Sequence, residues 1–206
     1  TMGLGALPLG YADPDVNAAV ARQLEGGALF TLPHPLEAEV AELLCRLIPC
    51  AEMVRFGKNG SDATSGAVRL ARAFTGRDLI AACGYHGWQD WYIGTTTRSL
   101  GVPKAVRDLT RTFTYNRIET LERVFEEHPG QVAGVIMEPV GVEVPRPGFL
   151  ESVRELCTRH GTLLIFDEII TGFRLALGGA QEYFAVLSDL ACFGKGLANG
   201  YPLAAL

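Results

Sequence analysis

The chain has 206 residues, of which 48% are hydrophobic and 20% are charged, proportions that are ordinary for a globular protein with a buried core. Its 23 acidic and 18 basic residues are interspersed and give a formal net charge of -5, so no basic stripe is available to follow a nucleic-acid backbone. No segment approaches the ~20 apolar residues that a membrane-spanning helix needs. Composition therefore argues against nucleic acid and membrane as partners.

The cysteines are odd in number and lack a metal-binding pattern. None of the five has a C-x-x-C partner or a nearby histidine at zinc spacing, so no metal site is expected. We expect reduced, mostly buried thiols and a cytoplasmic location. The five are Cys45, Cys50, Cys83, Cys157 and Cys192.

The first 50 residues predict two helices. Asp13 and Pro14 supply a cap and a first-turn proline to a segment with helical periodicity, which Gly26-Gly27 ends. Pro35 opens a second periodic segment, and Pro49 halts it.

Beyond residue 50, short apolar segments alternate with helical ones. We predict strands at 53–56, 79–83, 112–115, 132–137, 162–166 and 190–193, and helices at 61–74, 118–127 and 149–159. Continuously apolar strands joined by helices are typical of a mainly parallel sheet that is buried on both faces. The predicted fold is therefore an α/β class three-layer α/β/α sandwich. The loop 94–103 is the best candidate for a mobile element, and the final PLAAL has the composition of a strand interior, which suggests a fragment of a longer polypeptide.

Four segments at strand ends deserve inspection, because open α/β sheets bind ligands at the carboxyl ends of their strands. The first, residues 57–63 (GKNGSDA), leads into a helix and could be either a serine-capped turn or an anion cradle. It lacks the lysine-serine ending of a P-loop, which argues against a nucleoside triphosphate. The second, residues 84–88 (GYHGW), could lay an aromatic ring against a planar ligand or simply anchor a turn. Its His86 is either a base or a hydrogen-bonded structural group.

The other two segments carry ionisable groups. Asp167 and Glu168 follow a very hydrophobic strand, where adjacent carboxylates are costly to desolvate without partners. A protonated heterocyclic nitrogen, a magnesium ion or Arg174 could be that partner. Lys195 lies between two glycines after the last apolar segment; it is either a solvated lysine or a desolvated amine with a lowered pKa that can form a Schiff base. Together, an anion cradle, a ring, a carboxylate and an amine are the groups that pyridoxal 5′-phosphate (PLP) requires.

The order of these motifs along the chain resembles a known family. The succession NGSDA, YHG, EP, FDE-x-x-TGFR and GK is similar to that of the class III PLP-dependent aminotransferases, and within them most similar to the glutamate-1-semialdehyde 2,1-aminomutases. The resemblance covers nearly the whole chain. It implies the large domain of a PLP-dependent transferase of fold type I, spanning residues 1–206, with the family's N-terminal segment and C-terminal small domain missing. It also implies a homodimer in the full-length protein.

The resemblance assigns roles to the cofactor-binding residues. Gly60 and Ser61 would bind the PLP phosphate, while Tyr85 would stack on the pyridine ring and Ile169 would pack on its opposite face. Asp167 would pair with the pyridinium nitrogen and keep it protonated.

Further roles concern the catalytic amine and the substrate. Lys195 would form the Schiff base with the cofactor and would then carry the proton between the substrate α-carbon and the cofactor. Glu138, in MEPV, corresponds to a family glutamate near the substrate entrance, and His86 is a second substrate-side candidate. The substrate would be a small amino or keto compound.

Two departures bear on the reaction. Where the family has Ser-Gly-Thr-Glu, this chain has Asn59-Gly60-Ser61-Asp62, which keeps a hydroxyl and an acid. Many aminotransferases carry a glutamine at the position of Ile170. Its replacement by isoleucine favours the aminomutase-like branch. The leading hypothesis is amino-group transfer, either within an amino aldehyde or from a donor to a keto acid, aldehyde or keto sugar. The alternatives are a non-catalytic remnant that binds PLP or a partner, and a magnesium-dependent phosphotransferase that uses Ser61 and Asp167.

Overall fold

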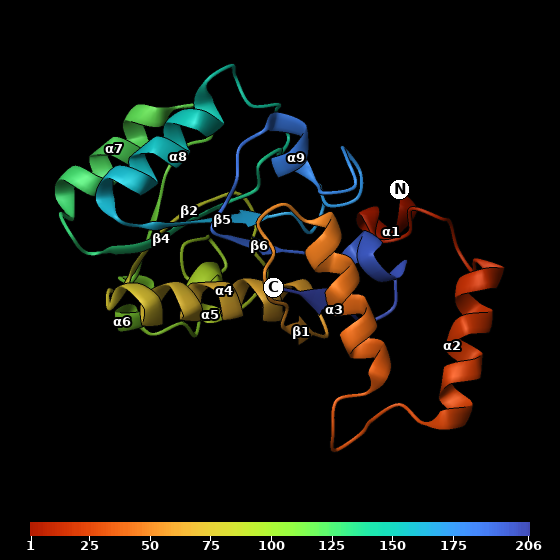
Figure 1. Ribbon diagram of the computed structural model, residues 1–206. Helices are drawn as coiled ribbons and strands as arrows, with labels where there is room; N and C mark the ends of the chain where they lie inside the picture. The colour runs from red at the N-terminus through yellow and green to blue at the C-terminus, as the bar shows by residue number, and fades with distance from the viewer.

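Five parallel strands form the central sheet of the computed structural model, which describes residues 1–206 (Figure 1). Their order across the sheet is β3-β2-β4-β5-β6, so the sheet begins with β2, gains β3 on one side and then extends through β4 and β5 to β6 on the other. The strands are β2 (Leu79–Cys83), β3 (Thr110–Thr112), β4 (Val132–Met137), β5 (Leu163–Asp167) and β6 (Leu190–Cys192).

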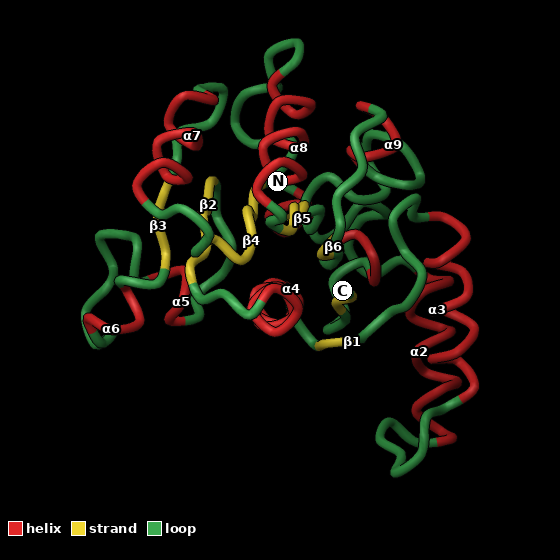
Figure 2. Tube along the Cα trace, turned by 60° about the vertical axis from the view of Figure 1, so that its left-hand side comes forward, coloured by secondary structure: helices red, strands yellow, loops and turns green.

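Helices cover both faces of this sheet, which confirms the predicted three-layer α/β sandwich. On one face α4 (Gly60–Thr75) crosses beneath β4, β5 and β6, with the short α5 (Asp90–Ile93) and α6 (Lys104–Arg107) nearby (Figure 2). On the other face α7 (Ile118–Glu127) packs against α8 (Phe149–His160). Each interface has its own apolar core, because the continuously apolar strands present side chains to both layers.

The longest helix, α4, begins and ends where its sequence dictates. The Asn59 side chain accepts a hydrogen bond from the Asp62 amide, and the Asp62 carboxylate accepts one from the Asn59 amide, so the two form a reciprocal cap. Gly76 ends the helix in a left-handed conformation at φ 68°. This cap fixes the position at which Gly60 and Ser61 enter the helix.

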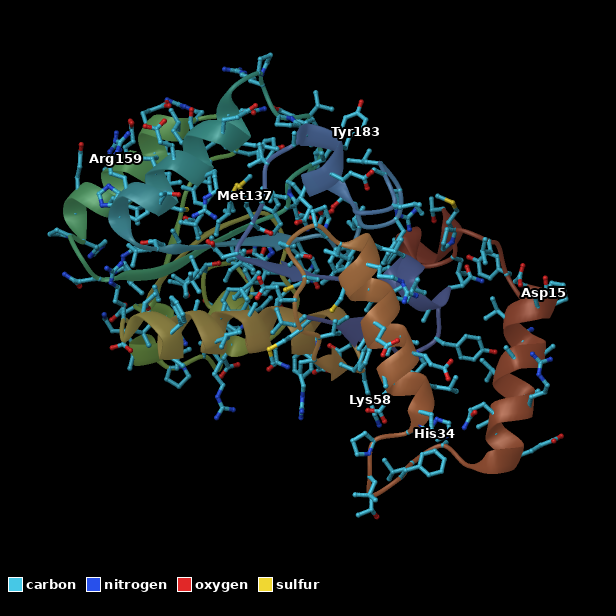
Figure 3. The ribbon with its side chains drawn as sticks, in the orientation of Figure 1. Asp15, His34, Lys58, Met137, Arg159 and Tyr183 are labelled. Carbon is cyan, nitrogen blue, oxygen red and sulfur yellow. The ribbon has the colours of Figure 1, made fainter.

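Three helices precede the sheet, α1 (Met2–Gly5), α2 (Pro14–Gly26) and α3 (Pro35–Leu47). Of these, α2 stands away from the body (Figure 1). None of the residues of α2 is buried, whereas α3 packs Leu44 against β6 and β7. Figure 3 shows Asp15 and His34 in this N-terminal region and Met137 within the body. No helix combines the length and apolar character needed to cross a bilayer.

Two short strands form a separate antiparallel pair, β1 (Phe56–Gly57) with β7 (Ala204–Ala205). The strand predicted at 53–56 is therefore wrong in extent and outside the main sheet: β1 begins only at Phe56, although Arg55 and Leu206 exchange backbone hydrogen bonds at the end of the β1–β7 pair. The strand predicted at 112–115 ends at Thr112 instead. The strand character predicted for PLAAL is confirmed by β7.

Short elements between the main strands were not predicted, because one helical turn leaves no periodicity to detect. They are α1, α5, α6, α9 (Ala180–Phe184) and the 3-10 turn η1 (Lys195–Ala198). The other helices predicted from the sequence are confirmed within a few residues. All five cysteines are free thiols and three are buried, and burial raises the pKa of Cys83 to about 12.

Candidate active site

The ends of β2, β4, β5 and β6 meet the start of α4 at a single cavity of about 240 Å³. Of the eight site residues predicted from the sequence, all line this cavity. The lining residues are Asn59, Gly60, Ser61, Tyr85, His86, Gly87, Trp88, Glu138, Asp167, Ile169, Ile170 and Lys195. One expectation is corrected: Gly60 and Ser61 do not follow a strand of the main sheet, because α4 carries them in from the β1–β7 pair.

The start of α4 forms the floor of the cavity. Gly60 and Ser61 lie in its first turn, where backbone N–H groups have no acceptor within the helix and the helix dipole favours an anion. The Ser61 hydroxyl oxygen accepts a hydrogen bond from the Trp88 amide at 3.4 Å. A Cβ on Gly87 would lie 2.1 Å from this oxygen, so the glycine permits the close approach of the two segments.

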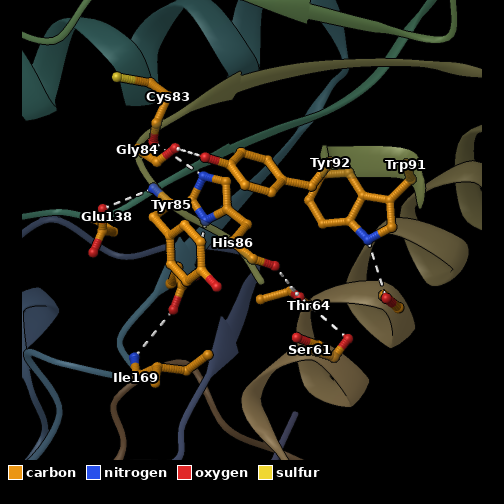
Figure 4. A network of polar contacts seen from close by, with 12 residues as sticks. Ser61, Thr64, Cys83, Gly84, Tyr85, His86, Trp91, Tyr92, Glu138 and Ile169 are labelled. Atoms are coloured by element: carbon orange, nitrogen blue, oxygen red, sulfur yellow. Dashed lines mark hydrogen bonds and ion pairs between the residues drawn. The ribbon is translucent and has the colours of Figure 1, made fainter. Parts of the chain in front are cut away.

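The Tyr85 ring faces the cavity, and the Tyr85 backbone is held by Glu138, the residue that follows β4. Tyr85 is 63% exposed, and its ring contacts Tyr92 edge to face, with 5.7 Å between the ring centroids. Glu138 Oε2 accepts a hydrogen bond from the Tyr85 amide at 3.0 Å, as Figure 4 shows. Burial raises the pKa of Glu138, and this amide opposes the rise. Glu138 thus has a structural contact as well as a place in the cavity wall.

Asp167 lies at the end of β5 and is held from two sides. Its Oδ1 accepts a hydrogen bond from the Ile169 amide at 3.2 Å, and its Oδ2 lies 2.8 Å from His86 Nδ1. The other ring nitrogen of His86 donates to the Cys83 carbonyl oxygen at 3.0 Å. Asp167 is 3% exposed and His86 is 1% exposed, so the pair is shielded from water on the side away from the cavity.

His86 lines the cavity, where it was predicted to be a substrate-side candidate, and its ring is also held by the protein. Both of its ring nitrogens are engaged by protein acceptors, and the Thr64 hydroxyl donates to the His86 carbonyl oxygen at 3.0 Å. Since neither nitrogen is free, the structure assigns His86 to the support of Asp167. The sequence pattern left this structural reading open.

Lys195 opens the 3-10 turn that follows β6. Its backbone has φ 45°, a left-handed conformation that is uncommon for a residue with a side chain. Burial lowers the pKa of the amine, while the charges of Asp167 and Glu138 raise it. Because burial is the larger effect, a greater fraction of the amine is neutral and nucleophilic than in a solvated lysine.

Glu168 and Arg174 do not pair with each other. The Glu168 carboxylate is fully buried and accepts hydrogen bonds from the Thr171 hydroxyl and the Ala180 and Gln181 amides. The Arg174 guanidinium donates to the Gly5 carbonyl oxygen. Occupied in this way, Glu168 is not available to complete a magnesium site with Asp167.

Four lining residues were not among the eight predicted site residues: Asn59, Gly87, Trp88 and Ile170. Trp88 is 69% exposed at the rim, and its place in GYHGW next to Tyr85 was the available signal. Asn59 was treated only as part of a turn, although its cap geometry places it in the lining.

Comparison with known proteins identifies the family. The family model described as Aminotransferase class-III matches residues 1–206. A 3-aminobutyryl-CoA aminotransferase from Cloacimonas acidaminovorans is 42% identical over 209 residues, covering 98% of this chain and 50% of the relative. A glutamate-1-semialdehyde 2,1-aminomutase from Natranaerobius thermophilus is 42% identical over 217 residues, with the same coverage of 98% and 50%.

A solved structure supports the same assignment. The FumI protein of Sphingopyxis sp. MTA144, solved in its PLP internal aldimine form, matches with a TM-score of 0.92 and 33% identity over 99% of this chain and 50% of that protein. This chain spans about half the length of the curated relatives it matches. It belongs to the class III aminotransferase family.

Proposed function

We propose that this chain contributes the cofactor-binding and catalytic large domain of an enzyme that transfers amino groups with PLP. The observation that carries the proposal is that Lys195, Asp167 and Tyr85 line one cavity with the start of α4. The family assignment supports PLP as the cofactor. When bound, PLP supplies an aldehyde that takes up amines and a pyridinium ring that accepts electrons.

The residues present fit such a group. Tyr85 and Ile169 both line the cavity, so a flat ring would stack on the exposed aromatic side chain of Tyr85 and contact the apolar side chain of Ile169. Gly60 leaves room for Ile169, because a Cβ on it would lie 2.5 Å from the Ile169 Cδ1. The first turn of α4 offers N–H groups to a phosphate, with the Ser61 hydroxyl beside them.

Two ionisable side chains would carry the chemistry. Asp167 would hold a proton on the ring nitrogen, and His86 would keep its carboxylate in place through the 2.8 Å contact. Lys195 would be the amine that holds the cofactor, and it would later move a proton to and from the substrate α-carbon, roles that its lowered pKa supports.

The substrate remains a proposal in two forms. An aminomutase reaction on an amino aldehyde is supported by the relative of that name. A transamination of a keto acid, aldehyde or keto sugar is supported equally by identity, since the relative named as an aminotransferase is also 42% identical. We favour the aminomutase-like reaction because Ile170 cannot supply the polar side chain that many transaminases place there.

The full polypeptide is proposed to be a cytoplasmic homodimer. About half of each curated relative lies outside the matched region, so we propose that residues 1–206 form a large domain completed by a further domain. A chain that binds PLP without turnover is the contrasting proposal.

The cofactor assignment is tested by the visible spectrum of the purified protein with added PLP. We expect a Lys195-dependent absorbance band and a borohydride-stable label on Lys195. Lys195→Ala should lack both, whereas Lys104→Ala, at an exposed lysine outside the cavity, should retain both. Absence of the band and the label from the wild type would overturn the assignment.

The reaction is tested by three amino compounds offered separately to the full-length protein. An aminomutase should convert the bound cofactor with 4,5-diaminovalerate and leave glutamate unreacted. Conversion by glutamate or by a 3-aminoacyl thioester would favour transamination, and binding without conversion by any compound would favour a non-catalytic chain.

A further inference from the structure

The turn that carries Lys195 is conformationally strained and needs an external restraint. Lys195 and Asn199 both have φ 45°, and Gly200 has φ 94°, so two residues with side chains lie in the left-handed region within five positions. Such conformations persist only where the surroundings hold them. Within the turn, the Leu197 amide donates to the Gly194 carbonyl oxygen at 3.0 Å and the Tyr201 amide donates to that of Ala198 at 3.0 Å.

On one side, the β-ladder restrains the start of this turn. The Phe193 amide donates to the Ala205 carbonyl oxygen at 2.8 Å and the Ala205 amide donates back at 3.0 Å. These bonds fix the chain two residues before Lys195. They do not reach residues 195–200, so the rest of the turn depends on other contacts.

On the other side, the N-terminal arm (residues 5–10) covers the turn, and one side chain joins them. Asn199 Oδ1 accepts a hydrogen bond from the Leu9 amide at 3.1 Å, and Asn199 Nδ2 donates to the Gly10 carbonyl oxygen at 3.2 Å. The side-chain oxygen thus accepts from the backbone of one residue, and the side-chain nitrogen donates to the backbone of the next. Asn199 is 8% exposed whereas Leu9 is exposed, so the two hydrogen bonds are partly buried and the buried amide of Asn199 loses its partners when they are broken.

Packing contacts place the arm directly on the turn. A Cβ on Gly196 would meet Pro8 at 3.5 Å, and one on Gly200 would meet Leu7 at 2.6 Å. Arg174, from the loop after β5, donates to the Gly5 carbonyl oxygen and lies within 3.7 Å of the same Gly196 position. Figure 1 shows the N-terminal arm beside this turn, although the two segments lie near opposite ends of the chain.

We infer that Asn199 is a positioning residue for Lys195. By binding the arm at Leu9 and Gly10, its side-chain amide holds the turn in the strained conformation that points the amine into the cavity. The effect on Lys195 rests on the proposed function, but the restraint itself is a property of the chain without cofactor. A simpler role for Asn199 is only to tolerate the left-handed backbone, since Asn does so more readily than most residues.

Asn199→Gly separates these two roles. Glycine adopts the left-handed backbone freely and removes only the two side-chain hydrogen bonds. In the cofactor-free protein, amide hydrogen exchange of Leu9 should become about tenfold faster, and that of Leu197 several-fold faster, as expected for the loss of two bonds of ordinary strength. Asn199→Asp keeps the acceptor for Leu9 but places an oxygen against the Gly10 carbonyl, so it should give an intermediate increase.

Asn116 provides a matched control. It too is left-handed, at φ 60°, donates to the Val144 carbonyl oxygen at 3.0 Å and accepts from the Arg146 amide at 2.8 Å, but it lies outside the cavity. Asn116→Gly should accelerate exchange at Arg146 and leave Leu197 unchanged. Unchanged exchange in β4 and β5 verifies the fold in every variant, and if Asn199→Gly does not fold, Asn199→Asp carries the same comparison.

Two results would overturn the inference. If Leu9 exchanges faster in Asn199→Gly while Leu197 does not, the amide holds only the arm and Asn199 has no positioning role. If exchange changes at neither Leu9 nor Leu197, the only role of Asn199 is to tolerate the left-handed backbone. With PLP added, cofactor release should be several-fold faster in Asn199→Gly than in Asn116→Gly. A wild type without a Lys195-dependent band would instead refute the proposed function and leave the exchange result standing.

Discussion

His86 Nδ1 lies 2.8 Å from Asp167 Oδ2, and the opposite ring nitrogen faces the Cys83 carbonyl oxygen. A carbonyl oxygen only accepts, so Nε2 donates to Cys83, while the Asp167 carboxylate is the acceptor that faces Nδ1. The imidazole therefore links the ends of β2 and β5 through a buried hydrogen-bonded chain. Asp167 is fixed by the protein before any ligand arrives.

Replacing His86 by phenylalanine tests this link. His86→Phe keeps a planar ring but leaves the Cys83 carbonyl and one Asp167 oxygen without their donor, so we expect the free energy of unfolding to fall by about 1–3 kcal/mol. PLP affinity should fall about tenfold, because a 1.4 kcal/mol change is tenfold in binding. Urea unfolding of the cofactor-free protein and PLP titration measure the two effects. His128→Phe, outside this cavity, is the control. Equal losses of stability and of PLP affinity in that variant would contradict the role of His86 in holding Asp167.

The pKa of Lys195 is predicted to lie below its ordinary value of 10.5, because burial disfavours the ammonium form. Competitive acylation across a pH series should give a midpoint for Lys195 below 10.5. The charge of Glu138 raises the lysine pKa, so Glu138→Gln should lower the midpoint further. Glu143→Gln, at an exposed position, should leave it unchanged. A midpoint at or above 10.5 in the wild type would refute the desolvated amine.

The same shift predicts a pH dependence of stability. In the folded protein Lys195 binds its proton less tightly than in the unfolded chain, so the unfolded state holds more protons between the folded pKa and 10.5. The free energy of unfolding should therefore rise with pH across that window, and Lys195→Met should remove this part of the rise. If the free energy of unfolding changes with pH in the same way in the wild type and in Lys195→Met, Lys195 has the same pKa in the folded and unfolded states, which contradicts the prediction.

Much of the fold could be predicted because burial on both sheet faces leaves a strong signal. The stretches at β2 and β4 are continuously apolar, and the longer helices α4, α7 and α8 each bury one periodic face. The position of Lys195 followed from the same reasoning, since a polar residue just after a buried strand lies at the carboxyl edge of the sheet.

Contacts between distant segments were beyond such reasoning. Asn199 meets Leu9 across 190 positions, and no periodicity or motif signals an amide that pairs with a backbone so far away. His86 illustrates a related limit: its residue type permits a base, a ligand or a hydrogen-bonded support, and only the positions of Asp167 and Cys83 decide among them.

Glu168 is predicted to be essential for the stability of the loop after β5. Its carboxylate accepts from the Thr171 hydroxyl, from the Ala180 amide at 2.8 Å and from the Gln181 amide at 3.0 Å. Glu168→Ala leaves three donors without an acceptor, and we expect the free energy of unfolding to fall by about 3 kcal/mol. Urea denaturation measures the change.

An exposed glutamate serves as the comparison. Glu155 pairs with Arg159 at 2.8 Å but its side chain is 72% exposed, so Glu155→Ala should change stability by less than about 0.5 kcal/mol. If Glu168→Ala is no more destabilising than Glu155→Ala, the buried carboxylate does not anchor the loop.

Gly60 and Ile169 are predicted to be energetically coupled. A Cβ at position 60 would lie 2.5 Å from the Ile169 Cδ1, and Ile169 also lies against Gly194, where an added Cβ would be 3.5 Å from its Cγ2. Gly60→Ala should therefore displace Ile169 into the cavity and weaken PLP binding by about tenfold. Ile169→Val removes the clashing Cδ1 and leaves Cγ1 at 3.3 Å, a contact that a small shift relieves.

The double variant decides whether this clash is the cause. Ile169→Val alone should have a small effect, about 0.5–1.5 kcal/mol on the free energy of unfolding. Combined with Gly60→Ala it should restore most of the PLP affinity, giving a coupling energy of about 1 kcal/mol in the double-mutant cycle. Additive losses would mean that Gly60 is needed for its backbone at the start of α4 rather than for the room it leaves to Ile169.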